Sequence, residues 1–138
     1  MTNASHEEIH RGGCLCGAVR ITVRRHLRNV VNCHCSQCVR SHGHYAAHTS
    51  AKDDAITVDG AENVTWYRSS ARAERGFCKV CGSQLFWKPL GTDRTAITAG
   101  SLDQPTGLKS KIHIHVASKP DYYEITDDLP QYERDNEI

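Results

Sequence analysis

The chain has 138 residues and a mass of 15.4 kDa, which is the size of one domain. Lysine and arginine number 17 against 16 aspartate and glutamate, and this near-neutral balance argues against charge-driven binding to nucleic acid or to an anionic membrane. Only 38% of the residues are hydrophobic, so we expect a thin core that needs support from a metal or from covalent bonds. The odd number of cysteines, seven, excludes a framework in which every cysteine is paired in a disulfide.

Short segments of alternating apolar and polar residues predict a mainly β fold. The segment 17–24 places Val19, Ile21 and Val23 on one face, which is typical of a half-buried strand. Further strands are predicted over 29–32, 43–48, 55–58, 63–68, 73–77, 84–88, 94–99, 111–116 and 122–126. One helical turn is expected over 36–41, and the polar end 132–138 is expected to fray. The sequence therefore predicts many short antiparallel strands with little helix.

The ends of the chain lead to expectations about domain limits and compartment. Residues 1–9 are expected to form a tail, residues 10–134 a single domain and residues 135–138 a second tail. The first residues carry neither a basic segment nor an apolar run, and no apolar stretch reaches the roughly 18 residues of a membrane span. We therefore expect a cytoplasmic protein, in which cysteines stay reduced and close cysteines are metal ligands or catalytic groups.

The seven cysteines fall into three clusters along the chain. A structural zinc ion takes four ligands, and the first and third clusters together supply four. The third cluster is followed by Gly82 and has the form of a zinc knuckle, in which backbone N–H groups face the sulfurs and a glycine adopts a positive φ. We call the complete set the four-cysteine cluster (Cys14, Cys16, Cys78 and Cys81) and the remainder the three-cysteine cluster (Cys33, Cys35 and Cys38).

Three protein ligands with one free position are typical of a catalytic zinc rather than a structural one. Two alternatives stay open for the three-cysteine cluster. A Cys-x-x-Cys pair, which this cluster contains, can be a thiol–disulfide redox site. A histidine can instead complete a second structural zinc site, and the candidates close in sequence are His34, His42, His44 and His48.

Three motifs in this order resemble a known family. They are Gly-Gly-Cys-Leu-Cys-Gly-Ala-Val from Gly12, Cys-His-Cys-Ser-Gln-Cys from Cys33 and Phe-Cys-Lys-Val-Cys-Gly-Ser from Phe77. Together with segments 99–103, 113–120 and 128–132, they resemble the glutathione-dependent formaldehyde-activating enzyme family, which includes centromere protein V, over roughly residues 10–134. The resemblance implies a β-tent of antiparallel sheets around a structural zinc held by the four-cysteine cluster. It also implies a second zinc held by the three-cysteine cluster.

The activity implied by the resemblance is S-(hydroxymethyl)glutathione synthesis, a carbon–sulfur lyase-type reaction in which glutathione adds to formaldehyde. The expected cofactors are two zinc ions with glutathione as co-substrate, and the expected partners are a small thiol and a small aldehyde, with neither nucleic acid nor membrane. The catalytic residues would be Cys33, Cys35 and Cys38, where a thiol would lose its proton and become the nucleophile. The alternative function is a non-enzymatic zinc-binding module that binds a thiol metabolite or a protein partner.

Other side chains are candidates for proton transfer or carboxylate binding at this site. Taken singly, each histidine, arginine or lysine is more typical of an ordinary solvent-exposed position. Candidate proton carriers are His42, His44, His48 and, on one face of a predicted strand, His113 and His115. Candidate partners for the two carboxylates of glutathione are Arg40, Arg68, Arg72 and Lys111. The aromatic residues expected in the core are Trp66, Tyr67, Phe86 and Trp87.

Overall fold

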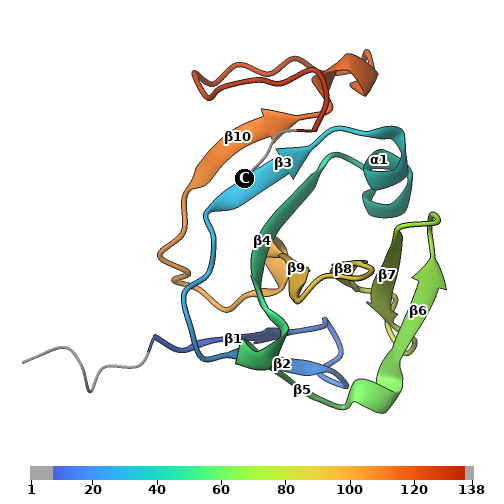
Figure 1. The fold of residues 1–138 in the computed structure, drawn as a ribbon, viewed down its shortest axis with the longest axis vertical. Helices are drawn as coiled ribbons and strands as arrows, with labels where there is room; N and C mark the ends of the chain where they lie inside the picture. Colours follow the sequence, from blue (N-terminus) through green and yellow to red (C-terminus); the bar gives the residue numbers. More distant parts are fainter. Residues whose placement is uncertain (1–7, 136–138) are drawn as a thin grey trace, which may run out of the picture.

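The computed structural model describes residues 8–135 as two β-sheets and one short α-helix (Figure 1). The predicted tails, 1–9 and 135–138, lie mostly outside these residues. The prediction of a mainly β fold with little helix is confirmed. Among the described residues, no helix has the length and apolar character that crossing a membrane requires.

The smaller sheet is antiparallel and has the order β1-β2-β5. Its strands are β1 (His10–Gly13), β2 (Arg20–Val23) and β5 (Ile56–Asp59). The sequence predicted β2 and β5 but missed β1, because its four residues include two glycines and show no alternation of apolar residues. The glycines are needed there: a Cβ added at Gly12 would lie 2.2 Å from the Ser101 carbonyl oxygen.

The larger sheet has the order β10-β3-β4-β9-β8-β7-β6. Its strands are β3 (Val30–Cys33), β4 (Ala46–Lys52), β6 (Val64–Arg68), β7 (Ala73–Cys78), β8 (Gln84–Pro89), β9 (Arg94–Thr98) and β10 (Ser110–Ile114). All neighbours are antiparallel except β10 and β3, which are parallel. The sheet is therefore mainly antiparallel, as predicted, and the parallel pair at this edge arises because a long connection returns the chain in the same direction as β3.

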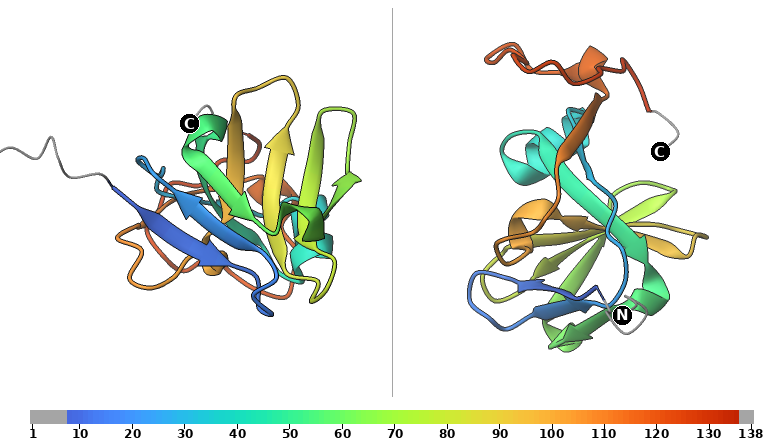
Figure 2. Two further views of the ribbon diagram at one scale, coloured as in Figure 1. Left: turned by 90° about the horizontal axis from the view of Figure 1, so that it is seen from below. Right: turned by 90° about the vertical axis from the view of Figure 1, so that its left-hand side faces the viewer.

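The main core joins the two sheets. It contains Ile21 and Val23 from β2, Leu85 from β8 and Ile97 from β9, all almost completely buried. Figure 2 shows the small sheet, with β1 and β2 in blue and β5 in green, beside the large sheet. A second, smaller cluster of Val31, Ile112 and Ile114 lies where β3 meets β10.

The single described α-helix, α1 (Ser36–His42), follows β3 where one helical turn was predicted. Cys35 caps its first turn, because its sulfur accepts a hydrogen bond from the Cys38 amide at 3.3 Å. Gly43, with φ of 82°, ends the helix and donates its amide to the Val39 carbonyl. Short 3₁₀ turns are η2 (Asp53–Ala55), η3 (Ala61–Asn63), η4 (Ala99–Ser101) and η5 (Val116–Ser118).

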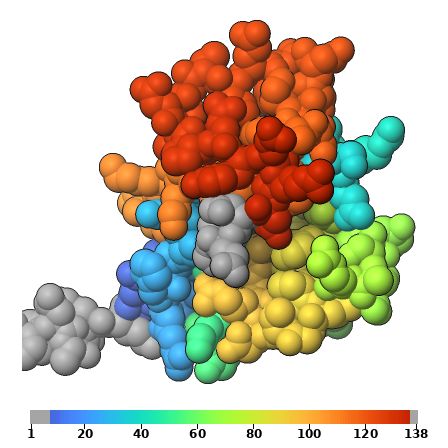
Figure 3. All heavy atoms as spheres, turned by 45° about the horizontal axis from the view of Figure 1, so that its top comes forward, coloured from blue at the N-terminus to red at the C-terminus, as the bar shows by residue number. Residues whose placement is uncertain are grey.

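The C-terminal part of the chain differs from the sequence predictions. No strand forms over 122–126, where the chain runs as turns and irregular backbone. Residues 132–134 are not frayed: the backbones of Tyr132 and Arg134 pair with those of His113, His115 and Val116. Figure 3 shows the residues after β10 (orange to red) covering the upper part of one face of the molecule.

Candidate functional site

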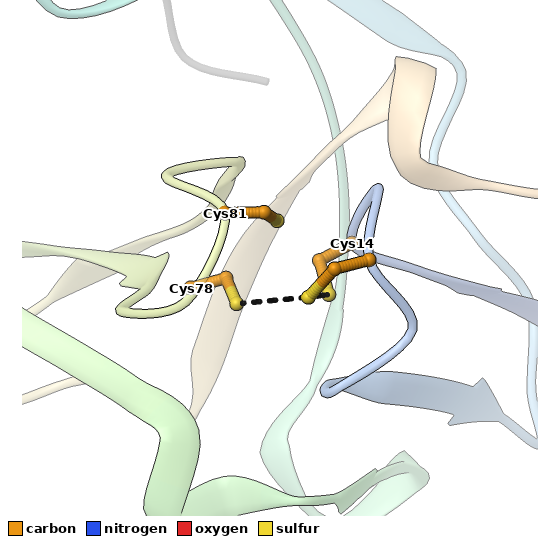
Figure 4. Close-up of side chains that lie close together, drawn as sticks. Cys14, Cys78 and Cys81 are labelled. Carbon is orange, nitrogen blue, oxygen red and sulfur yellow. Dashed lines mark hydrogen bonds between the residues drawn. The ribbon is translucent and has the colours of Figure 1, made fainter.

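The four-cysteine cluster lies where two turns meet at the edge of the main core. Cys14 follows β1, Cys78 ends β7, and Figure 4 shows both of them and Cys81 pointing toward one another. The four sulfurs lie within 4.8 Å of one another, and the Cys16 sulfur lies 3.6 Å from that of Cys14 and 3.8 Å from that of Cys78. Sulfurs around one tetrahedral zinc ion at about 2.3 Å would be about 3.8 Å apart. The cluster therefore fits a metal and is too open for a disulfide.

The turn after β7 has the knuckle geometry that its sequence predicts. Gly82 has φ of 80° and donates its amide to the Cys78 carbonyl at 2.8 Å. The Val80 amide donates to the Cys78 sulfur at 3.4 Å. The Ser83 hydroxyl lies 3.2 Å from the Cys81 sulfur, and this hydrogen bond, together with those from the backbone amides of Ser83 and Cys16, lowers the pKa of Cys81 to about 5. These donors favour the thiolate form that a metal requires.

The three-cysteine cluster lies between the end of β3 and the first turn of α1. Its sulfurs also lie within 4.8 Å of one another, so the group can hold a metal. Hydrogen bonds from the Cys33 and Cys38 thiols lower the pKa of Cys35, and nearby His115 adds to the effect. The buried Arg75 donates from Nη2 to the Cys38 sulfur at 3.6 Å. One thiolate is thus favoured at Cys35, with a guanidinium beside the cluster.

No histidine of residues 8–135 joins the three sulfurs within that distance. Both ring nitrogens of His34 are used elsewhere: Nδ1 lies 2.5 Å from the Tyr123 hydroxyl and Nε2 lies 2.8 Å from Nδ1 of His113. His113 Nε2 in turn lies 3.0 Å from the Asp127 carboxylate. This buried chain of side chains fastens the C-terminal segment to the backbone between Cys33 and Cys35. The geometry therefore favours an open three-cysteine site over one completed by a histidine.

A cavity of about 710 Å³ opens beside the three-cysteine cluster and is lined by all three of its cysteines. This volume suits a small metabolite. Four arginines line it, namely Arg28, Arg72, Arg75 and Arg94, and Asp135 is the acidic residue among the described lining. Of the predicted carboxylate partners only Arg72 lines this cavity, whereas Arg40 and Arg68 are exposed elsewhere and Lys111 lines a smaller hollow next to it.

The candidate proton carriers separate into two groups. His48 and His115 line the cavity, and His42 packs edge-on against His48 with ring centroids 5.4 Å apart. His44 instead contacts Tyr122, with its Nδ1 2.7 Å from the hydroxyl. The prediction that His113 and His115 share a strand face was wrong, because β10 ends at Ile114 and His115 turns away with φ of 56°.

Two of the predicted core aromatics are in fact exposed, Trp66 by 44% and Tyr67 by 64%. Trp66 covers Gly76 and stacks on Phe86, which is buried as predicted. Trp87 is half-buried and lines the cavity. The edge position of β6 explains the exposure of Trp66 and Tyr67, because an edge strand has only one neighbouring strand to cover its side chains.

Sequence reasoning missed Arg28, Arg75 and Arg94. Arg75 could have been singled out, because it shares one face of a predicted strand with the apolar Ala73. A charged side chain on a buried face destabilises the fold unless it has a partner or a function. Arg28 and Arg94 lie at strand ends far apart in the sequence, and only the pairing of β4 with β3 and β9 brings them together.

Known proteins match this chain over most of its length. The family described as "Glutathione-dependent formaldehyde-activating enzyme" matches residues 9–118. An uncharacterized lyase of Schizosaccharomyces pombe is 27% identical over 117 residues, which is 83% of this chain and 84% of the relative. A crystal structure of a Rhodobacter sphaeroides protein is similar, with a TM-score of 0.59 and 29% identity over 72% of this chain and 97% of that one. The chain therefore belongs to the glutathione-dependent formaldehyde-activating enzyme family.

Proposed function

We propose that this protein is a zinc-dependent carbon–sulfur lyase-type enzyme that adds glutathione to formaldehyde, or a related thiol to a small aldehyde. The observation that carries the proposal is the cavity, which joins the three-cysteine cluster to a lining of four arginines. Glutathione bears a thiol and two carboxylates, so its chemistry matches the two kinds of lining. The family and the lyase name of the yeast relative support the same reaction class.

Zinc is expected in both clusters. The four-cysteine cluster would hold a structural ion, and the three-cysteine cluster would hold a second one with a position free for a ligand. A zinc ion with three thiolate ligands favours the ionised form of a thiol that binds in that position.

The residues of the chain hold the reactants and move one proton. In the net reaction, the thiol sulfur forms a bond to the aldehyde carbon, the carbonyl π bond breaks, and the thiol proton ends on the new hydroxyl. The guanidinium of Arg75 stabilises negative charge at Cys38, and the arginines of the lining bind carboxylates. His115 lines the cavity near Cys35 and is the proposed carrier of the proton.

Magnetisation-exchange NMR on formaldehyde and its glutathione adduct tests the reaction. We expect the wild-type protein to accelerate the exchange above the rate without protein, and Cys35→Ser to lose the acceleration. Elemental analysis should find two zinc ions in the wild type and fewer in this variant. An exchange rate equal to that of the protein-free solution would refute the reaction and leave the non-enzymatic zinc-binding module.

A further inference from the structure

One part of the cavity lining is cationic and lies apart from the three-cysteine cluster. Arg28 precedes β3, and Arg94 begins β9. Both meet β4, an inner strand of the large sheet, at Ser50: the Arg28 backbone amide donates to the Ser50 carbonyl at 3.1 Å, and Arg94 Nε donates to Ser50 Oγ at 3.2 Å. The fold therefore gathers two guanidinium groups at one point of the lining.

Few negative charges of the described residues lie near this pair of cations. Within residues 8–135, no carboxylate lies at ion-pair distance from Arg28 or Arg94. The nearby Asp53 contacts Lys88 and Thr95 at 2.6 Å each, and the charge of Arg94 helps to lower the pKa of Asp53 from beyond that distance. Burial and then the charge of Arg94 lower the pKa of Arg28 to about 10. Two like charges that lie close together in a partly buried place repel each other and destabilise the protein without a ligand. An anion bound between them would remove this repulsion.

Arg28 also has an unused hydrogen-bond donor. Its Nη2 donates to the His48 carbonyl at 3.2 Å, but its Nε is buried without a partner. Lys111 and His26 line a smaller hollow that shares Arg28 and Arg94 with the cavity, and no acidic residue is among its described lining. Basic residues thus outnumber acidic ones around the pair, with Asp135 the acidic residue of the described cavity lining, and this excess of positive charge favours an anionic ligand.

The distance between the two ends of the cavity limits the ligand. Cys33 lies five positions after Arg28, which along an extended chain corresponds to roughly 16 Å between Cα atoms. A thiol with its carboxylate directly beside the sulfur would be too short to use both ends. The lining also includes the apolar side chains of Val31, Trp87 and Ile114, against which the middle of a longer ligand can pack.

We propose that Arg28 and Arg94 form a carboxylate-binding subsite, which makes the cavity selective for thiols that carry a carboxylate several bonds away from the sulfur. This inference rests on the proposed function, because it takes the sulfur of the same ligand to be at the three-cysteine cluster. Cysteamine, which has no carboxylate, and free cysteine, whose carboxylate is close to the sulfur, would gain nothing from the subsite.

Binding to the zinc-loaded protein in the absence of aldehyde tests the subsite. Calorimetry, with the fluorescence of Trp87 as a second signal, would compare glutathione with its diethyl ester, which keeps the thiol but lacks both carboxylate charges. We expect wild type to bind glutathione about tenfold or more tightly than the ester. In Arg94→Gln this preference should largely disappear through weaker binding of glutathione, with the affinity for the ester unchanged.

The matched control is Arg11→Gln, which removes an exposed arginine of the other sheet and should keep the wild-type preference. Arg28→Gln should have the same effect on glutathione binding as Arg94→Gln. If the half-buried Arg28 is needed for folding, the Arg94→Gln variant still tests the subsite, because Arg94 is exposed. Equal binding of glutathione and ester to wild type, or a preference that survives in Arg94→Gln, would overturn the subsite and leave the reaction intact. If wild type binds neither compound, the proposed function fails as well.

Discussion

The two cysteine clusters have similar sulfur spacing but very different surroundings. In the four-cysteine cluster, Cys14 and Cys78 belong to the main core that joins the two sheets. In the three-cysteine cluster, Cys33 packs beside only the small group of Val31, Ile112 and Ile114, and all three sulfurs line the cavity. The first cluster thus links elements of both sheets, whereas the second faces a space where a small molecule fits.

Under the proposed function, the number of ligands and their burial would together separate a structural metal site from a catalytic one. Four sulfurs complete a tetrahedral site and leave no position for a substrate, and removing one disturbs the core around them. Three sulfurs beside a cavity leave a position open and carry little of the packing. The buried Arg75 is found only beside the second cluster, where its charge partly offsets that of the thiolates.

The largest expected effect is on stability, and it should differ between the clusters. Cys78→Ser removes a fully buried ligand from the core and should cost several kcal/mol, comparable with the roughly 5–15 kcal/mol of a whole domain. Cys35→Ser should unfold close to wild type while losing zinc. Urea unfolding and zinc analysis of both variants check this. Equal destabilisation by the two substitutions would break the contrast between the clusters.

The next largest effect concerns His115. His115→Asn removes the proposed proton carrier, while asparagine tolerates the left-handed backbone that His115 adopts. We expect the exchange of formaldehyde with its glutathione adduct to slow by about 100-fold, with the zinc content unchanged. The NMR rate together with elemental analysis measures both. A wild-type rate would assign the proton transfer to another group or to water.

Replacing Arg75 should weaken only the second cluster. Arg75→Met keeps the length of the side chain and removes the donor to Cys38, so the affinity for the second zinc or the exchange rate should fall about 10–100-fold. A chelator titration that resolves two zinc ions should show the more tightly held one unchanged. Loss of both ions together would mean that Arg75 supports the whole fold.

Tyr123→Phe should have a moderate effect on the segment that covers the second cluster. It leaves the buried His34 Nδ1 without its partner, at a cost of about 1–2 kcal/mol in the free energy of unfolding. Tyr122→Phe is the matched control, because the hydroxyl of Tyr122 contacts the exposed His44 and should cost much less. Denaturant unfolding of the two variants measures the difference, and equal costs would contradict the buried chain of contacts.

The smallest effect is a pH dependence on the cavity side. Burial, and after it the positive charges of His42, Arg75 and Arg28, together lower the pKa of His48 to about 3. Because the unfolded chain binds a proton near its usual pKa of about 6.5 and the folded chain does not, stability falls as the pH falls below about 6.5. Wild type should lose about 1 kcal/mol more than His48→Gln between about pH 7 and pH 5.5. Parallel curves for the two proteins in urea unfolding would contradict a neutral buried His48.

Local patterns allowed much of the fold to be predicted. The alternation of Val19, Ile21 and Val23 predicted β2, because the period of a strand is visible within a few residues. The turn at Gly82 was predictable for the same reason, since its ligands and its glycine are adjacent in the chain. Strand β1 and the exposure of Trp66 could not be predicted in this way. The first depends on a close approach between two backbones and the second on an edge position, and both are properties of the assembled sheets.

By itself, the sequence determined the mainly β class, the division of the cysteines into four and three, and the family. Each of these depends on residue types and short spacings. Only the tertiary structure decided which cluster joins the core and which faces a cavity, and which charges line that cavity. Arg28, Arg75 and Arg94 come from separate segments, and β10 returns parallel to β3 after a long connection. Such contacts depend on how the sheets pair and pack, and that information is spread over the whole chain rather than held in any one segment.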